Sequence, residues 1–286
     1  MSFLRKVPFV FDLRDLWPET GYSLGVLREG SLSAKFFSWI ERVAVANATG
    51  INVLTPAFRE DLIQRKMVLP DKIKVIPNGI DLSKINQYEK TDDIRRNFGW
   101  EERFVVLYAG AHGMANHLEQ LIEVAEILRD IPEIFIACIG DGICLPQLKR
   151  KVSEKGLRNI CFYGPYSREE TTKLISNSDV CTAVLKPASA FEKVYPNKIF
   201  EYMAHEKPII LTIDGAAKGL VERAQSGIFV PPEMPVAFGK AVRFLKNNPD
   251  IRRKMGFNGK KYVTKNFKLD NLYTQMTDFL ISVAKY

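Results

Sequence analysis

One short stretch of the sequence combines residues that could bind an anion and a sugar. Pro196 and Asn197 are typical of a helix start. Lys198 follows them directly, and Glu201 stands three residues after Lys198. The free backbone amides in the first turn of a helix attract anions. The spacing of the lysine and the glutamate places both on one helix face, where the carboxylate can accept hydrogen bonds from a vicinal diol such as a ribose. This predicts a nucleotide site, although an ordinary surface Lys–Glu pair has the same spacing.

Glycine-bearing turns follow three apolar, strand-like runs. They lie at Gly110 to Gly113, at Gly140 to Gly142, and at Tyr163 with Gly164. A residue without a Cβ lets a ligand approach the backbone closely, and parallel strands gather their carboxyl ends at one sheet edge. We therefore expect the turns to line the crevice that also holds residues 196–201. The sequence contains neither the dinucleotide fingerprint nor the Walker lysine loop, which disfavours dehydrogenases and NTPases.

A parallel sheet must position these motifs. From residue 101 onward, short β-branched runs alternate with helical patterns, as in doubly wound α/β proteins. Strands are predicted at 104–109, 133–139, 159–163, 180–184, 208–212 and 228–230, with intervening helices that include 117–129 and one capped by Ser167. These elements predict one complete Rossmann-like domain over residues 103–268.

The first 85 residues follow the same pattern with fewer elements. Strands are predicted at 8–13, 50–54 and 72–76, helices at 31–48 and 56–66 with Thr55 as the cap of the second, and a tight turn at 77–81. Three parallel strands leave sheet edges uncovered, which indicates an incomplete domain over residues 1–85. A polar linker is expected at 86–102, and a helix without a strand partner at 269–286.

Composition narrows the class of partner. The 286 residues are 46% hydrophobic with a formal charge of +8, which favours anionic partners. No apolar run is long enough to cross a membrane, and no secretory signal is visible, so a cytoplasmic location is expected. The cysteines are read as buried thiols; they are Cys138, Cys144, Cys161 and Cys181. The basic run 240–268 and the aromatic helix 35–43 predict either ordinary helix faces or contact with an anionic membrane surface.

The order of the motifs resembles the group 1 glycosyltransferases, family 4. The motifs are Val-Ile-Pro-Asn-Gly-Ile-Asp at 75–81, the glycine turn at 110–113, Gly-Asp-Gly at 140–142, Phe-Tyr-Gly at 162–164, and Lys-Ile-Phe-Glu-Tyr-Met-Ala at 198–204 ahead of Lys-Pro-Ile-Ile at 207–210. The resemblance implies an α/β protein of GT-B type, with two Rossmann-like domains and a C-terminal helix that crosses back to the first. It also implies retaining, metal-independent transfer of a sugar from a UDP-linked donor to a lipid-linked or saccharide acceptor.

The resemblance also assigns roles to individual residues. Glu201 would hold the donor's ribose, and Lys198 would lie at the diphosphate. The remaining donor-binding residues would be Gly110, His112 and Gly113 at the diphosphate and sugar, Gly142, Tyr163 and Gly164 around the base, and Pro196, Asn197 and Ile199 at the helix start. No cofactor, metal or nucleic acid is expected. The stretch from Asp12 to Glu19 resembles members that build bacterial surface polysaccharides, and Asp12, Arg14 and Asp15 would face the acceptor or the interdomain cleft.

Three features depart from the family pattern. The family's first catalytic glutamate falls on Lys193, with Glu192 one residue away, so both stand beside Lys198 as catalytic candidates. The usual basic pair is missing from 111–117, and the first domain is short, as in an N-terminally truncated member that could be inactive alone. Two alternatives stay open: a nucleotide-sugar epimerase of the same fold, and a non-catalytic donor-binding subunit whose partner supplies the missing lobe.

Overall fold

The computed structural model describes residues 7–85 and 92–285, while residues 1–6, 86–91 and 286 lie outside the described part. The chain divides into two compact units. The first comprises residues 1–79, 188–195 and 267–286, and the second comprises residues 80–187 and 196–266. The first unit is thus built from three separate pieces of the chain.

The second unit contains a six-stranded parallel sheet in the order β6-β5-β4-β7-β8-β9. Its strands are β4 (Phe104–Ala109), β5 (Ile134–Ile139), β6 (Ile160–Gly164), β7 (Val180–Val184), β8 (Ile209–Thr212) and β9 (Gly227–Phe229). Every predicted strand of this domain is confirmed to within one residue at each end. All residues of β4, β5 and β7 are buried, as expected for central strands covered on both faces.

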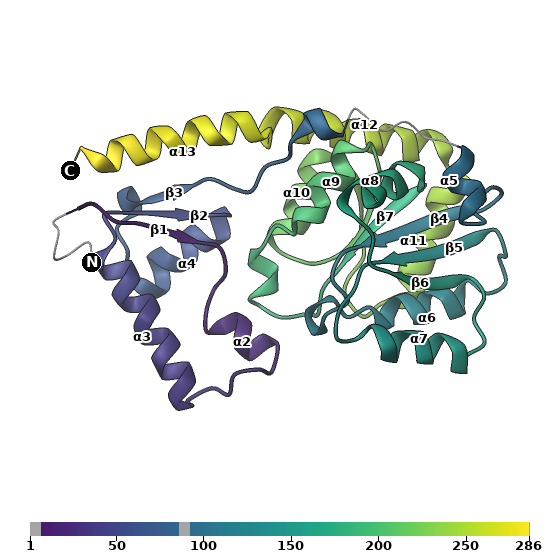
Figure 1. Ribbon diagram of the computed structural model, residues 1–286, viewed down its shortest axis with the longest axis horizontal. Coiled ribbons are helices and arrows are strands. Elements are labelled where there is room, and N and C mark those ends of the chain that lie inside the picture. The colour runs from purple at the N-terminus through teal and green to yellow at the C-terminus, as the bar shows by residue number, and fades with distance from the viewer. Residues whose placement is uncertain (1–6, 86–91, 286) are drawn as a thin grey trace. The chain divides into compact units, whose positions relative to one another are not determined.

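Helices cover both faces of this sheet (Figure 1). One face carries α6 (Glu119–Ile127), α7 (Leu145–Glu154) and α11 (Pro235–Asn247); the other carries α8 (Arg168–Asn177), α9 (Asn197–Ala204), α10 (Ala216–Ala224) and α12 (Pro249–Asn266). The predicted cap of α8 is confirmed as a capping box between Ser167 and Glu170. The strand order reverses between β4 and β7, and ligands of doubly wound sheets bind at such a switch point.

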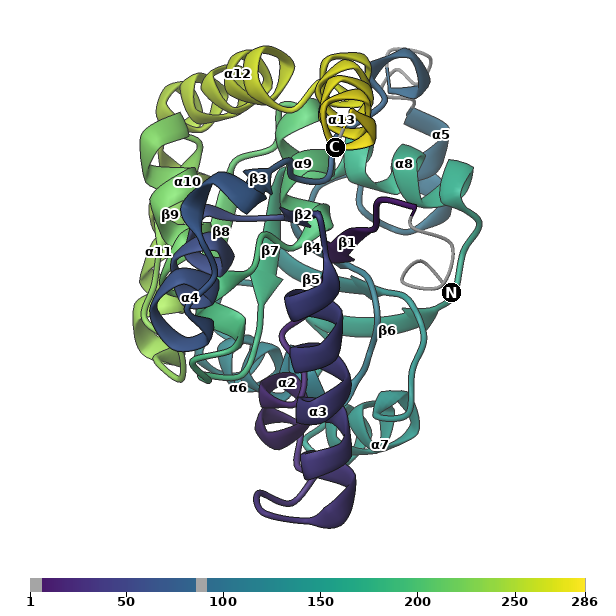
Figure 2. The ribbon, with the colours of Figure 1, turned by 90° about the vertical axis from the view of Figure 1, so that its left-hand side faces the viewer.

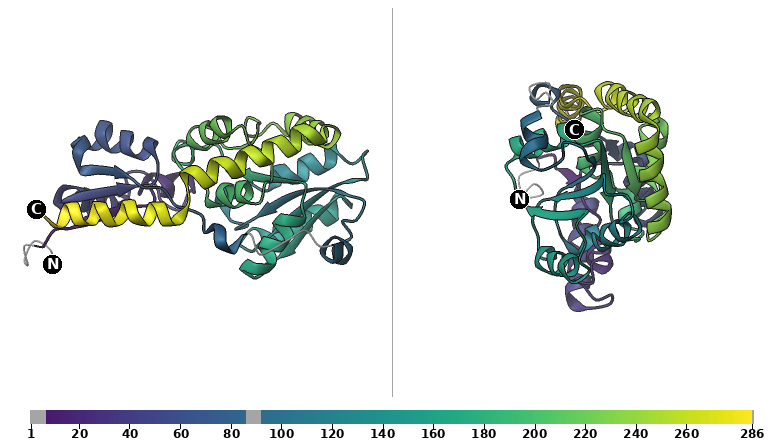
Figure 3. Two further views of the ribbon diagram at one scale, coloured as in Figure 1. Left: turned by 90° about the horizontal axis from the view of Figure 1, so that it is seen from above. Right: turned by 90° about the vertical axis from the view of Figure 1, so that its right-hand side faces the viewer.

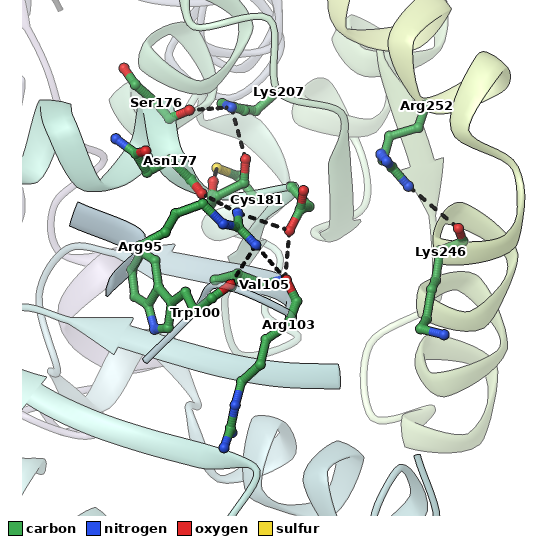
Figure 4. A network of polar contacts seen from close by, with 12 residues as sticks. Arg95, Trp100, Arg103, Val105, Ser176, Asn177, Cys181, Lys207, Lys246 and Arg252 are labelled. Carbon is green, nitrogen blue, oxygen red and sulfur yellow. Dashed lines mark hydrogen bonds and ion pairs between the residues drawn. The ribbon is translucent and has the colours of Figure 1, made fainter. Parts of the chain in front are cut away.

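The stretch predicted as a linker contains a helix. α5 (Asp92–Asn97) belongs to the second unit, and η2 (Leu82–Lys84) precedes it; residues 86–91 of the predicted linker lie outside the described part. The Arg95 guanidinium donates to the carbonyl oxygens of Trp100 at 2.7 Å, Arg103 at 2.5 Å and Asn177 at 2.7 Å (Figure 4). These bonds fasten α5 to the start of β4 and the end of α8, a role that the polar composition of the stretch did not reveal.

The first unit contains a three-stranded parallel sheet in the order β1-β2-β3. Its elements are β1 (Val10–Leu13), α2 (Glu19–Ser23), α3 (Leu32–Asn47), β2 (Gly50–Val53), α4 (Pro56–Lys66), η1 (Pro70–Lys72), β3 (Ile73–Val75) and α13 (Leu269–Ala284). The predicted strands and helices are confirmed with slightly shorter ends, and the Thr55 hydroxyl caps α4 as expected by accepting from the Phe58 amide. The two Rossmann-like parallel sheets expected from the sequence are therefore present.

The C-terminal helix packs on the first sheet, as expected. α3 and α4 lie on one face of β1 to β3, and α13 runs along the other (Figures 1 and 3). Phe279 and Val283 lie directly over Gly50, where a Cβ would approach their side chains within 2.8 Å. The tight turn predicted at 77–81 is wrong, because no hydrogen-bonded turn forms there and Gly79 instead packs under Leu272 of α13. Within the described residues, no helix has both the length and the apolarity needed to cross a bilayer.

Candidate functional site

The three glycine turns lie side by side at the carboxyl edge of the second sheet. The Gly110 amide donates to the Ile139 carbonyl at 2.9 Å, and the Gly140 amide donates to the Gly164 carbonyl at 2.8 Å. Gly140 has a φ of 137°, and a Cβ there would overlap the carbonyl of Gly110. Only glycine allows these turns to pack so closely. The edge next to the switch point is therefore lined by main chain.

Lys198 is a buried cation in the first turn of α9. Its Nζ lies 3.8 Å from the centre of the Tyr108 ring, and it has no hydrogen-bond acceptor among the described residues. Burial lowers the pKa of Lys198 to about 7, and the nearby carboxylate of Glu201 opposes that shift. A Cβ on Gly110 would come within 2.8 Å of this Nζ. The ammonium thus lies against the first glycine turn with its hydrogen-bonding capacity unused, which suits an anionic ligand.

Glu201 lies one helical turn after Lys198. Its side chain is 37% exposed, and its Oε1 stands 4.0 Å from Nη2 of Arg168, the first residue of α8. Burial raises the pKa of Glu201, while Arg168 and Lys198 act in the opposite direction. The carboxylate is accessible and bears no close hydrogen bond in the described part, so a diol could reach it.

The start of α9 is held against the end of β4. The Tyr202 hydroxyl accepts from the Ala109 amide at 2.9 Å and donates to the Ala109 carbonyl at 3.2 Å. Pro196 is the N-cap residue and makes no side-chain cap, so no capping side chain competes with a ligand for the amides of the first turn. The Ile199 side chain is buried at 1% exposure, and its amide donates to the Pro196 carbonyl at 3.0 Å. Only the backbone around Ile199 borders the site.

His112 is fully buried beside the glycine turns. Its ring lies 5.9 Å from that of Tyr108 and 5.5 Å from that of Phe162, and neither ring nitrogen has a partner among the described residues. Burial lowers the pKa of His112 to about 4, and the neighbouring Lys198 adds to this shift, so the ring is neutral at physiological pH. Gly142 packs so tightly on the His112 backbone that a Cβ would overlap it. Gly113 is less confined and forms the N-cap of η3 (Met114–Asn116).

The Tyr163 side chain is engaged in aromatic contacts. Trp100 donates its indole N–H to the Tyr163 hydroxyl at 3.3 Å, and Phe98 and Tyr166 complete an aromatic cluster beside α5. Burial raises the pKa of Tyr163 to about 12, which keeps the phenol protonated. Any contact of residues 163–164 with a base at this edge would therefore come from the backbone.

Glu192 and Lys193 lie in segment 188–195, which packs with the first unit. Both belong to η4 (Phe191–Lys193), and the Lys193 ammonium forms an ion pair with the buried carboxylate of Asp61 on α4. The Thr55 hydroxyl donates to the Lys193 carbonyl at 2.6 Å. Glu192 is exposed. Lys193 thus has a structural partner, and the catalytic roles of both residues stay predictions.

Asp12 and Arg14, at the end of β1, belong to a polar network of the first unit. Arg14 pairs with Asp12 at 2.8 Å and donates to the side-chain oxygen of Asn78 at 3.2 Å. Asn52 of β2 donates to the other Asp12 oxygen at 2.9 Å. Partial burial raises the pKa of Asp15. The network lies at the carboxyl edge of the first sheet, and it leaves Asp15 outside its hydrogen bonds in the described part.

The structure gathers part of the predicted site at the switch point of the second unit. Lys198, Glu201, His112 and the glycine turns meet there, and the sequence-based interpretation missed Tyr108, Tyr202 and Arg168. The signal for Tyr202 was present, because it stands four residues after Lys198 in the same helix. No group of three or more His, Cys, Asp or Glu side chains suited to a metal occurs within the described ranges. The arrangement can bind an anion on main-chain amides and Lys198, with a diol on Glu201.

Comparisons with known proteins agree on one family. Residues 90–262 match the family described as Glycosyl transferases group 1, and residues 1–79 match the Glycosyl transferase 4-like domain. Alpha-D-kanosaminyltransferase of Streptomyces kanamyceticus is 26% identical over 228 residues, covering 77% of this chain and 57% of that protein. O-antigen chain mannosyltransferase C of Escherichia coli is 25% identical over 219 residues, covering 73% and 56%. The chain spans about half the length of the curated relatives it matches.

Solved structures share the architecture. The crystal structure of Anabaena HepE in complex with UDP aligns with a TM-score of 0.80 at 19% identity, over 98% of this chain and 74% of that one. Sucrose-phosphate synthase from Thermosynechococcus elongatus aligns with a TM-score of 0.77 at 20% identity, over 98% and 70%. At these identities the likeness concerns the fold.

Proposed function

The chain belongs to the group 1 glycosyltransferases, and from this premise we propose that it moves a sugar from a UDP-linked donor to a saccharide or lipid-linked acceptor. Relatives named for colanic acid biosynthesis and for O-antigen assembly support a role in bacterial surface polysaccharides. The HepE structures that contain UDP and UDP-glucose support the choice of donor. The chain spans only part of its relatives, so the activity proposed is that of the whole protein.

One observation carries the proposal. The Lys198 ammonium is buried beside Gly110 without a hydrogen-bond acceptor in the described part, at a helix start that faces the switch point. Burying a cation without a partner costs free energy, which a bound diphosphate would recover. Glu201 stands one turn further along the same helix, with its carboxylate accessible to a diol. A solvated Lys–Glu pair would leave the lysine exposed instead.

The proposed mechanism is direct transfer with retention. The bond between the sugar's anomeric carbon and the diphosphate breaks, and the electron pair leaves with the diphosphate. The α9 amides and Lys198 stabilise the charge that develops on this leaving group, which allows catalysis without a metal. The acceptor hydroxyl attacks the same face of the sugar and gives its proton to the departing phosphate. Neither Glu192 nor Lys193 needs to form a covalent intermediate in this scheme.

Nucleotide binding tests the proposal. We expect Glu201→Gln to weaken UDP binding roughly tenfold or more, since a charge-assisted hydrogen bond to the ribose is lost. The matched control is Glu206→Gln, because Glu206 is an exposed carboxylate paired with Lys260. Isothermal titration calorimetry measures both affinities. Equal UDP affinities in the wild type and the Glu201 variant would contradict the ribose assignment.

A second assay addresses the chemistry. Incubation with UDP-sugar and no acceptor, followed by NMR of the products, should show the donor unchanged at C2, C3 and C4 apart from slow release of free sugar and UDP. Conversion into an epimeric UDP-sugar would show instead that the same site serves an epimerase.

A further inference from the structure

Helix α3 presents apolar side chains on two opposite faces. Ala34 and Val45 are buried against the first unit, together with Glu41. The opposite face is an exposed stripe of five large apolar residues: Leu32 at 85% exposure, Phe36 at 56%, Trp39 at 56%, Ile40 at 42% and Val43 at 41%. A surface helix normally turns charged residues outward, whereas here the larger apolar side chains face out and a glutamate faces in. Such a contiguous patch marks an interaction surface.

The stripe projects from the unit. Figures 1 and 2 show the N-terminal half of α3 extending beyond the three strands of its sheet. Aromatic rings consolidate this end: Phe36 lies 6.1 Å from Trp39, and Trp17 lies 5.4 Å from Phe37. The exposed rings therefore pack on one another, and no other element of the unit covers them in the described part.

A basic pocket of about 600 Å³ lies along one side of α3. Its cations are Arg42, Arg65, Lys66 and Lys72, against the carboxylates of Glu19 and Glu41. Lys66 pairs with Glu41 and Arg65 with Glu19, which leaves a positive excess at Arg42 and Lys72. On the wall opposite α3, Met67 and Leu69 are exposed at 84% and 67%. Met67 and Leu69 therefore place exposed apolar side chains beside the cations of the pocket.

We propose that this surface docks the protein on a bilayer that contains anionic phospholipid. The stripe enters the boundary between headgroups and acyl chains. The exposed cations Lys35 and Arg42, which lie along one edge of the stripe on the same helix, then meet the lipid phosphates.

Charge favours the bilayer over a second copy of the chain. The formal charge is +8, and antiparallel pairing of two stripes would bring the Lys35 and Arg42 edges of both helices together. An anionic bilayer instead complements these edges. The inference concerns residues of the first unit alone, so it stands or falls independently of the donor site in the second.

Co-sedimentation with lipid vesicles tests the proposal on the full chain. The wild type should bind vesicles of phosphatidylcholine with phosphatidylglycerol more tightly than vesicles of phosphatidylcholine alone, and added salt should weaken the binding. Phe36→Ser with Trp39→Ser should lower the partition coefficient more than tenfold, since two interfacial anchors are lost. Arg42→Gln should lower it about fivefold, the effect of one cation near an anionic surface.

Trp39 also offers a direct readout. In a Trp17→Phe background, which removes the other partly exposed tryptophan at this end of α3, the Trp39 fluorescence should shift to the blue on vesicle binding. The shift should be absent when Trp39→Phe, which retains an aromatic anchor, is added. Trp100 is fully buried and serves as an internal reference. Far-ultraviolet circular dichroism should show that each variant is folded, because the substituted side chains are exposed.

Matched substitutions on α12 separate this surface from other candidates. Phe257 is 60% exposed and Lys254 lies in the basic run, so Phe257→Ser and Lys254→Gln should leave vesicle binding unchanged. If these variants lower binding while the α3 variants do not, α12 is the docking surface and the proposal is wrong. It is equally wrong if the wild type ignores anionic vesicles, or if ultracentrifugation shows a dimer that Trp39→Ser dissociates.

Discussion

At the scale of single residues, Lys198 links the proposed nucleotide site to pH. Its pKa of about 7 in the free site means that the ammonium is only partly populated at neutral pH. A bound diphosphate would favour the charged form, so UDP binding should take up a proton above that pH. We expect UDP affinity to fall as the pH rises above about 7, by up to tenfold per pH unit.

The Lys198→Met variant provides the comparison. It should bind UDP weakly, with no such pH dependence above neutrality, and calorimetry in buffers of different ionisation enthalpy should show no proton uptake.

The stability of the fold should depend on Lys198 as well. Lys198 binds fewer protons in the folded chain than in the unfolded chain between pH about 7 and 10.5, so the free energy of unfolding rises with pH across that window. The variant should lose this rise. Identical pH profiles for wild type and variant would remove Lys198 from the diphosphate site.

At the scale of elements, segment 188–195 is fastened to α4. Burial disfavours the charged form of Asp61, yet hydrogen bonds from Arg65 and Lys193 outweigh it and lower the pKa of this carboxyl. Asp61→Ala would leave Lys193 without its carboxylate and Arg65 with Glu19 alone, and we expect a loss of about 3 kcal/mol in unfolding free energy. Urea denaturation followed by circular dichroism measures it. Glu60→Ala is the control, since that exposed residue bonds only to Gln64 in the described part, and an equal effect of both substitutions would refute the anchoring role.

Elements were the most predictable level of this structure. Buried strands such as β4 and β7 stand out because both faces are covered and their residues are uniformly apolar. The helix starts at Ser167 and Thr55 were readable from capping chemistry alone. The turn expected at 77–81 failed because Gly79 is required by packing against Leu272, nearly two hundred positions later in the chain. Propensity carries no information about such distant contacts.

The site was predictable only in part, for a similar reason. Lys198 and Glu201 were found through their spacing on one helix, which is local information. The environment that makes Lys198 unusual comes from Tyr108 on β4, a contact that depends on the strand order at the switch point. Lys193 shows the reverse case: its position in the family pattern made it a catalytic candidate, and only the structure reveals its ion pair with Asp61 of the first unit.

At the scale of the whole molecule, α13 completes the first unit. A substitution beneath α13 should therefore destabilise the first unit and leave the second unit unchanged. Gly50→Val would force Phe279 and Val283 away from β2, and we expect a loss of about 2 kcal/mol from overpacking. Hydrogen exchange should quicken in β1 to β3 and stay unchanged in β4 to β9, with UDP affinity intact. The control is Tyr273→Ser, an exposed position on α13. Faster exchange confined to the second sheet would show that α13 supports that unit instead.

The division of the chain also bears on its biogenesis. The second unit draws on residues 80–187 and 196–266, all of which are synthesised before residue 267. The first unit cannot be completed before residues 267–286 are made, because Gly50 and Gly79 lie beneath α13. During translation the nascent polypeptide should therefore complete the unit with the candidate site first. Strands β1 to β3 should stay open to chaperones until α13 has left the ribosome.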